Sequence, residues 1–215
     1  MLTLYYHPLA CSLGAQIALL QAQAPHQLAL VDLAGDRTAY RRINPLGTVP
    51  ALQTPTGVLT ESTAILLWLA QRYPQAQLLP QQADGLAQGV SFLAWLTASA
   101  QAARRQAKFP GRFTADAAAH AGVQAQGRAQ FMQCLGQIDA RLAQQPWVLP
   151  GAQPSACDAQ LMVYAHWCAL DGQPLDVWPH WQRWCQAMLQ RSAVQQALAV
   201  VASPLRTQGT LAPLL

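Results

Sequence analysis

The sequence predicts a small α/β domain followed by an all-helical domain. Over residues 1–77, short apolar runs alternate with helical patterns in the order β-α-β-α-β-β-α, which is typical of a small mixed four-stranded sheet covered by helices. Over residues 84–215 every pattern is helical. The stretch between them, residues 74–84, carries two prolines and several glutamines and is the expected linker.

The first predicted elements are a strand, a helix and a second strand. Residues 2–6 form an apolar run that Pro8 ends, as expected of a buried strand. The next helix is indicated by apolar residues at i, i+4, i+7 and i+11, namely Leu13, Ile17, Leu20 and Ala24. Pro25 ends this helix, because proline disfavours the helical conformation of the residue before it. We expect the second strand over residues 28–33.

Two further strands and a helix complete the first domain. Asn44-Pro45-Leu46-Gly47 is a predicted turn, and residues 49–52 lead into the third strand. Thr56-Gly57 marks a hairpin turn into the fourth strand, residues 58–60. A helix over residues 62–72 then buries Ile65, Leu66 and Leu69.

The second domain shows apolar stripes at helical spacing. One stripe consists of Phe131, Leu135, Ile138 and Leu142, and another of Trp178, Trp181, Cys185 and Met188. Between them, Ser155-x-x-Asp158 resembles a capping box in which Asp replaces the usual Glu or Gln, so a helix should begin there.

Composition narrows the class of protein. Hydrophobic residues make up 52% and charged residues 10% of the chain, which excludes a disordered protein. The longest apolar run, residues 64–70, is far shorter than the roughly 20 residues of a spanning helix, so we expect no membrane insertion. The net charge is +4, and the one basic cluster is Arg104, Arg105, Lys108 and Arg112. A nucleic-acid-binding surface would carry more cations with aromatic residues between them, so no nucleic acid partner is expected.

Cysteine and histidine usage predicts reduced thiols and no metal. The five cysteines form no CxxC pair, and the five histidines show no metal-ligand spacing. An odd number of cysteines without a secretory signal indicates a reducing compartment, so we expect a cytoplasmic protein. His166 lies between Ala165 and Trp167 and is predicted to be a core residue.

Three motifs together resemble the cytosolic glutathione transferase family. They are Pro8-Leu9-Ala10-Cys11-Ser12, then residues 44–52 (NPLGTVPAL), then residues 59–65 (LTESTAI). The Ala-Cys-Ser-Leu sequence resembles the bacterial beta class, and the Ser155-x-x-Asp158 helix start also matches the family. The resemblance implies a thioredoxin-like glutathione-binding first domain, an all-helical hydrophobic-substrate domain and a homodimer.

The resemblance also implies how glutathione, the expected co-substrate, is held. Pro50 would be a cis-proline, and the backbone of Val49 would pair with the cysteinyl part of glutathione. Ser62 and free N–H groups would hold the γ-glutamyl carboxylate, while Glu61 faces its α-ammonium. From the residues alone, Glu61-Ser62 is a helix N-terminus with Ser62 as its cap, a natural anion site. The two interpretations are compatible.

Cys11 is the candidate catalytic residue. Most free cysteines are small buried hydrophobic residues, as expected here for Cys134, Cys157, Cys168 and Cys185. Cys11 instead precedes the first helix, where the dipole and free N–H groups should lower its thiol pKa. The resemblance places it beside the glutathione sulfur, able to form a mixed disulfide, with Ser12 as a second candidate donor.

The sequence departs from the family at two positions. Where the beta class has a histidine near the active sulfur, this chain has Gln101, which can hydrogen-bond but cannot act as an acid or base near neutral pH. Asp36 stands where a lysine would meet the glycyl carboxylate, and Arg37 is the neighbouring candidate for that contact.

The leading functional hypothesis is a transferase that joins the glutathione thiolate to small hydrophobic electrophiles. A second hypothesis is a glutathione-dependent thiol–disulfide oxidoreductase with Cys11 as its nucleophile. A third is a non-catalytic binding protein with the glutathione transferase fold, to which the missing histidine would point.

Overall fold

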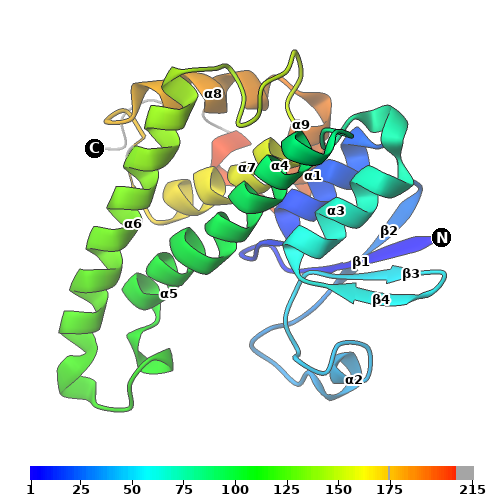
Figure 1. Cartoon of the computed structure of the whole chain (residues 1–215). Coiled ribbons are helices and arrows are strands. Elements are labelled where there is room, and N and C mark those ends of the chain that lie inside the picture. The colour runs from blue at the N-terminus through cyan, green and yellow to red at the C-terminus, as the bar shows by residue number, and fades with distance from the viewer. Residues whose placement is uncertain (174, 207–215) are drawn as a thin grey trace.

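The computed structural model describes residues 1–173 and 175–206 and shows an α/β unit followed by a helical unit (Figure 1). Residues 207–215 of the expected second domain lie outside the described residues. The first unit consists of β1 Leu2–Tyr6, α1 Ser12–Gln21, β2 His26–Leu30, α2 Thr38–Arg41, β3 Ala51–Thr54, β4 Gly57–Thr60 and α3 Ser62–Arg72.

The sheet is mixed, as predicted, with four strands in the order β2-β1-β3-β4. β1 pairs with β2 in parallel, and β3 runs antiparallel to both β1 and β4. α1 and α3 lie on one side of the sheet and α2 on the other (Figure 1). On the α2 side, Tyr40 packs with Val31, Val49 and Ala51 in a small separate cluster. The four-stranded sheet is thus covered on both faces.

The second strand and the first helix differ from their predicted bounds. α1 ends at Gln21 and not near residue 24, because the chain turns at Gln23, whose φ is 50°. β2 covers His26–Leu30 and not residues 28–33, because it pairs residue by residue with the whole of β1. Pairing with β1 therefore sets the bounds of β2, and the hydropathy pattern alone does not reveal this pairing.

The second unit, within the described residues, is helical throughout. After a 3-10 turn, η1 Pro74–Ala76, its elements are α4 Ala83–Trp95, η2 Leu96–Gln101, α5 Ala102–Lys108, η3 Pro110–Arg112, η4 Ala117–Ala119, α6 His120–Ala143, α7 Ala156–Leu170, α8 Pro179–Leu189, α9 Ser192–Val200 and η5 Pro204–Arg206. We keep residues 1–77 and 84–215 as the proposed domains. α1 packs between the sheet and helices α7 and α9, so the end of the sheet that precedes α1 lies against the second unit.

The predicted capping box and apolar stripes are present. Ser155 Oγ accepts a hydrogen bond from the Cys157 N–H, and the buried Asp158 carboxylate accepts bonds from the Ser155 N–H, the Val148 N–H and Trp184 Nε1–H. Asp158 thereby ties the start of α7 to α8 and to the preceding loop. The stripe residues of α6 and α8 are buried, except that Trp178 is half-buried.

Candidate active site

A cleft of about 600 Å³ lies where the two units meet, at the N-terminal end of α1. Its walls come from the loop before α1, the segment between β2 and β3, helix α5 with η3, and the end of α7. The lining side chains are His7, Leu9, Ala10, Cys11, Leu33, Arg37, Gly47, Thr48, Val49, Gln101, Arg104, Arg105, Lys108, Phe109, Arg112, Trp167, Leu170 and Asp171.

Cys11 lies between two other segments in this cleft. It is the N-cap residue of α1, and its thiol donates a hydrogen bond to the Val49 carbonyl oxygen at 3.4 Å. From the second unit, Gln101 Nε2–H donates to Cys11 Sγ at 3.9 Å. Gln101 therefore faces the cysteine sulfur, as the alignment with the family's histidine position predicts.

A π-helical segment, η2, carries Gln101 into the cleft. The wider turns of a π-helix are frequent at functional sites. The Tyr164 hydroxyl, buried in α7, donates to the Leu96 carbonyl oxygen at the start of this segment, at 2.6 Å. Gln101 itself is buried, so its amide has a fixed position beside the sulfur.

The predicted lowering of the Cys11 pKa is wrong. Burial raises the pKa of the Cys11 thiol, although hydrogen bonds with Ser62 and Gln101 and the charge of Arg105 act to lower it. The cost of desolvating a thiolate exceeds these contributions and those of the helix terminus. Cys11 is therefore protonated near neutral pH and presents an S–H donor to the cleft.

The other four cysteines are core residues, as predicted. All four are buried, none forms a disulfide, and none lines the cleft. Burial raises the pKa of Cys157 and of Cys185 to about 12. Cys11 is partly exposed and thereby differs from the four buried cysteines.

Ser12 closes the loop before α1 and does not line the cleft. Its hydroxyl accepts a hydrogen bond from the His7 N–H and donates one to the His7 carbonyl oxygen, both at 3.2 Å. The side chain is 1% exposed. This geometry fixes the loop that carries Cys11 and does not bring the Ser12 hydroxyl into the cavity.

Helix α7 holds the same loop from the other side, a contact that the sequence does not reveal. His166 Nε2 hydrogen-bonds to the Pro8 carbonyl oxygen at 3.1 Å, and Trp167 Nε1–H donates to the Leu9 carbonyl oxygen at 3.1 Å. Because a carbonyl only accepts, the His166 proton is on Nε2, and Nδ1 accepts from the Ser203 hydroxyl at 2.8 Å. His166 is buried, as predicted, and also links α7 to the Cys11 loop.

The loop that ends at Pro50 is fixed by side chains around α2. The Thr48 carbonyl oxygen accepts hydrogen bonds from the Tyr40 hydroxyl and the Asn44 amide, each at 2.7 Å. The Val49–Pro50 peptide bond is cis, as the resemblance implies. These contacts hold the Val49 carbonyl oxygen where it accepts the Cys11 thiol.

Arg37 lies on the cleft wall, whereas Asp36 does not. Arg37 Nη1–H donates to the Gly47 carbonyl oxygen at 3.1 Å. The exposed Asp36 carboxylate accepts hydrogen bonds from the N–H and hydroxyl of Thr38 and stays outside the cleft. Arg37, the candidate for the glycyl carboxylate, therefore lines the cleft.

The predicted capping role of Ser62 is wrong. The N-cap residue of α3 is Glu61, Ser62 is the first helical residue, and no side chain caps this helix. Glu61 has φ 66° and ψ 121°, a conformation that costs a non-glycine residue about 1–3 kcal/mol. Ser62 is buried, and its hydroxyl interacts with Cys11. The start of α3 therefore reaches Cys11 through Ser62, and Glu61 is exposed.

The basic cluster seen in the sequence faces this cleft. Arg104, Arg105, Lys108 and Arg112 line one wall. Asp171 forms ion pairs with Arg104 at 2.9 Å and with Lys108 at 2.7 Å. These cations are functional candidates that sequence reasoning missed, because their i, i+4 spacing alone does not show what they face.

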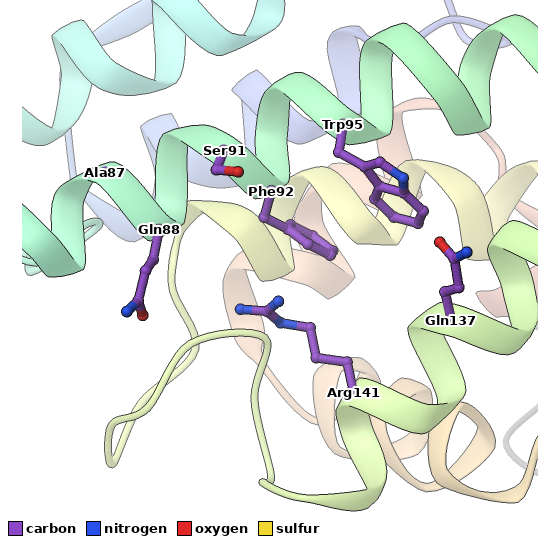
Figure 2. Close-up of a pocket in the computed structure, with 7 residues that line it drawn as sticks. All are labelled: Ala87, Gln88, Ser91, Phe92, Trp95, Gln137 and Arg141. Carbon is purple, nitrogen blue, oxygen red and sulfur yellow. The ribbon is translucent and has the colours of Figure 1, made fainter.

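A second hollow, between α4 and α6, lacks catalytic groups. Figure 2 shows Phe92 and Trp95 of α4 directed toward Gln137 and Arg141 of α6. Arg141, its one charged lining residue, donates to the Val148 carbonyl oxygen at 2.8 Å and lies 5.1 Å from the Phe92 ring centroid. The cleft with Cys11 is therefore the candidate active site. Among the described residues, no cluster could hold a metal ion, and no helix could span a membrane.

Comparisons with known proteins match both units of the chain. Residues 13–77 match the glutathione S-transferase N-terminal domain, and residues 101–187 match the glutathione S-transferase C-terminal domain. The chain is 30% identical over 202 residues to the glutathione S-transferase GstA of Escherichia coli O157:H7, covering 91% of this chain and 96% of that protein.

Solved structures share the fold over nearly the whole chain. A glutathione transferase homologue from Sulfitobacter with bound glutathione superposes with a TM-score of 0.85 at 28% identity, covering 94% of this chain and 99% of that one. A beta-class glutathione S-transferase from Sphingomonas chungbukensis gives a TM-score of 0.80 at 30% identity, covering 93% and 98% of the two chains. The chain therefore belongs to the glutathione S-transferase family.

Proposed function

We propose that the protein transfers glutathione to small hydrophobic electrophiles. The glutathione thiolate attacks an electrophilic carbon, a C–S bond forms, and the leaving group departs with its electron pair. The thiol proton passes to solvent. The observation that carries this proposal is the position of Cys11 Sγ, in a cleft between the Val49 carbonyl oxygen and the Gln101 amide. Relatives of this chain hold glutathione in the same fold.

Glutathione would bind along the wall formed by the first unit. The backbone of Val49, before the cis-Pro50, would pair with the cysteinyl part, and Ser62 would hold the γ-glutamyl carboxylate. Glu61 would face the α-ammonium, supported by its exposed position next to Ser62 at the start of α3. Arg37 would meet the glycyl carboxylate, supported by its place in the cleft lining.

Activation of the thiol would come from hydrogen-bond donors. Because burial keeps Cys11 protonated, its S–H can donate to a glutathione thiolate where it now donates to Val49. The Gln101 amide is a second donor beside the same sulfur. Donors fixed in a cleft favour the thiolate over the thiol and lower its pKa. Ser12 would act indirectly, by fixing the loop.

The oxidoreductase alternative has weaker support. Disulfide exchange requires Cys11 to attack as a thiolate, and its raised pKa makes that form rare at neutral pH. The direction of the pKa shift therefore favours transfer over disulfide chemistry.

The test combines conjugation with binding. Wild-type protein should conjugate glutathione to 1-chloro-2,4-dinitrobenzene, and Cys11→Ala should lower kcat/KM by about tenfold, the usual effect of losing one hydrogen bond to a charged group. Cys134→Ala, which removes a buried thiol outside the cleft, is the matched control. Tight glutathione binding without conjugation of any electrophile would instead show a binding protein, and reduction of disulfides alone an oxidoreductase.

We also propose a cytoplasmic homodimer. The cytoplasmic location is supported by the free state of all five cysteines, and the dimer by the exposed apolar side chain of Leu46, which is 65% exposed. Light scattering that gives the 23.3 kDa monomer mass at micromolar concentration would refute the dimer.

A further inference from the structure

The cleft is far more cationic than the protein as a whole. The chain carries 13 basic and 9 acidic residues. Five of the basic residues line this one cleft, whereas Asp171 is its one acidic residue. Asp171 is already engaged by Arg104 and Lys108, and Arg37 donates to the Gly47 carbonyl oxygen. The positive charge is therefore only partly neutralised by the protein.

Arg105 and Arg112 are the two cations on the wall from the second unit that no carboxylate of the described residues pairs with. Neither forms an ion pair with any described residue, and both are exposed on the cleft wall. The Arg112 guanidinium lies 4.5 Å from the Phe109 ring centroid, which holds it against the wall without neutralising it. A ligand anion in the cleft would meet both side chains.

These two arginines belong to a different unit of the chain from the proposed glutathione contacts. The groups proposed for glutathione, around Val49, Ser62 and Arg37, belong to the first unit, whereas α5 and η3 belong to the second. Arg105 is four residues after Gln101 and so lies on the same helix face, about 6 Å further along the axis. Arg105 therefore belongs to the same wall of the cleft as Gln101.

Apolar side chains line the same cleft as these cations. Phe109 lies against the Arg112 guanidinium, and Trp167 and Leu170 also line the cleft. Phe109 is 43% exposed and Leu170 is 38% exposed. A ligand here would gain both apolar contact and charge pairing, which a neutral electrophile would only partly use.

We propose that the second substrate is an anionic electrophile, an apolar or aromatic body with a carboxylate that Arg105 and Arg112 recognise. This inference rests on the proposed transferase function and specifies its substrate class. In the reaction tested below, the glutathione thiolate attacks the ring carbon that carries chlorine, the C–S bond forms, and chloride leaves with the C–Cl electron pair. The carboxylate takes no part in bond changes and serves for recognition.

The test compares two electrophiles that differ in charge, 4-chloro-3,5-dinitrobenzoate and its methyl ester. Each kcat/KM is divided by the uncatalysed rate with glutathione, which removes the difference in intrinsic reactivity. Wild-type protein should favour the carboxylate, and Arg105→Gln and Arg112→Gln should each lower the carboxylate-to-ester ratio about two- to fivefold, as for exposed ion pairs. Arg128→Gln removes an exposed arginine outside the cleft and should leave the ratio unchanged.

A binding measurement separates this inference from the proposed function. With S-methylglutathione in the first site, calorimetry should show that unreactive 3,5-dinitrobenzoate binds more tightly than its methyl ester, and that both arginine variants remove this preference. If neither electrophile is conjugated but the preference is found, the charge inference stands and the transferase function fails. If both electrophiles are conjugated and the variants leave the ratio unchanged, the function stands and the charge inference is overturned. Equal binding of acid and ester overturns it as well.

Discussion

The protonation state of Cys11 can be tested by alkylation at several pH values. A thiolate reacts and a thiol does not, so the labelling rate follows the thiolate fraction. Burial raises the pKa of Cys11 above its usual value, so the thiol is the main form at pH 7. Between pH 7 and pH 8.5 the labelling rate with iodoacetamide should therefore increase with pH and should not reach a plateau.

The order of labelling follows from burial. Cys157 and Cys185 have pKa values of about 12 and are fully buried. Their thiolate fraction at pH 7 is on the order of 0.001%, and neither side chain is exposed to the reagent. Peptide mapping should therefore find the first label on Cys11, and S-methylglutathione should slow this labelling by filling the adjacent space.

Two results would refute this reasoning. A labelling rate that levels off below pH 8 would mean that the helix terminus outweighs desolvation and that the Cys11 pKa is lowered after all. A first label on a buried cysteine would mean that the cleft does not open to solvent at Cys11. Cys11→Ser protein, in which the Cys11 signal must vanish, controls the peptide assignment.

Three further predictions concern stability and binding. Asp158→Ala leaves buried donors without an acceptor, among them Trp184 Nε1–H. It should lower the free energy of unfolding, measured by urea titration, by about 3–5 kcal/mol. A loss below about 1 kcal/mol would contradict the capping role of Asp158. Ser62→Ala should weaken glutathione binding in calorimetry by about 1–2 kcal/mol, because a charged carboxylate loses a donor, and unchanged affinity would remove Ser62 from the site. Burial lowers the pKa of His166 below 6.5, so the neutral imidazole contributes stability above that pH, and this contribution is lost as the pH falls through the folded-state pKa. The free energy of unfolding of the wild-type protein should therefore decrease between pH 7 and pH 5. An equal decrease in His166→Gln would exclude His166 as the cause.

Local sequence patterns predict most of the fold because its elements are locally determined. The apolar stripe of α6 repeats at helical spacing, and the Ser155 cap with Asp158 marks the start of α7 by its own side chains. The predicted bounds of β2 are wrong because the real bounds depend on pairing with β1, a strand more than twenty residues away in the sequence. Strand bounds follow tertiary pairing, which hydropathy does not encode.

The candidate site was predicted in part. Cys11, Val49, Arg37 and Gln101 meet in one cleft, as expected from motif positions. The direction of the Cys11 pKa shift was predicted wrongly, because it depends on burial in a cleft whose residues are distant in the sequence, such as Gln101, 90 positions away. The contact of His166 with the Cys11 loop spans 158 positions and involves a backbone carbonyl, which carries no residue-type signal.

Replacing Cys11 with serine separates the two chemistries that this site could perform. The amide of Gln101, which faces Cys11 Sγ, cannot take up the glutathione proton, so activation at this sulfur depends on donors and on the charge of Arg105. A serine hydroxyl still donates to the thiolate but cannot form a disulfide. Cys11→Ser should therefore retain conjugation within about tenfold of wild type, since one donor replaces another, while any mixed disulfide with glutathione is abolished. Parallel kinetics and intact-protein mass spectrometry measure both effects. Loss of conjugation together with loss of the disulfide would mean that Cys11 acts as a nucleophile, and the assignment of its thiol as a donor would be wrong.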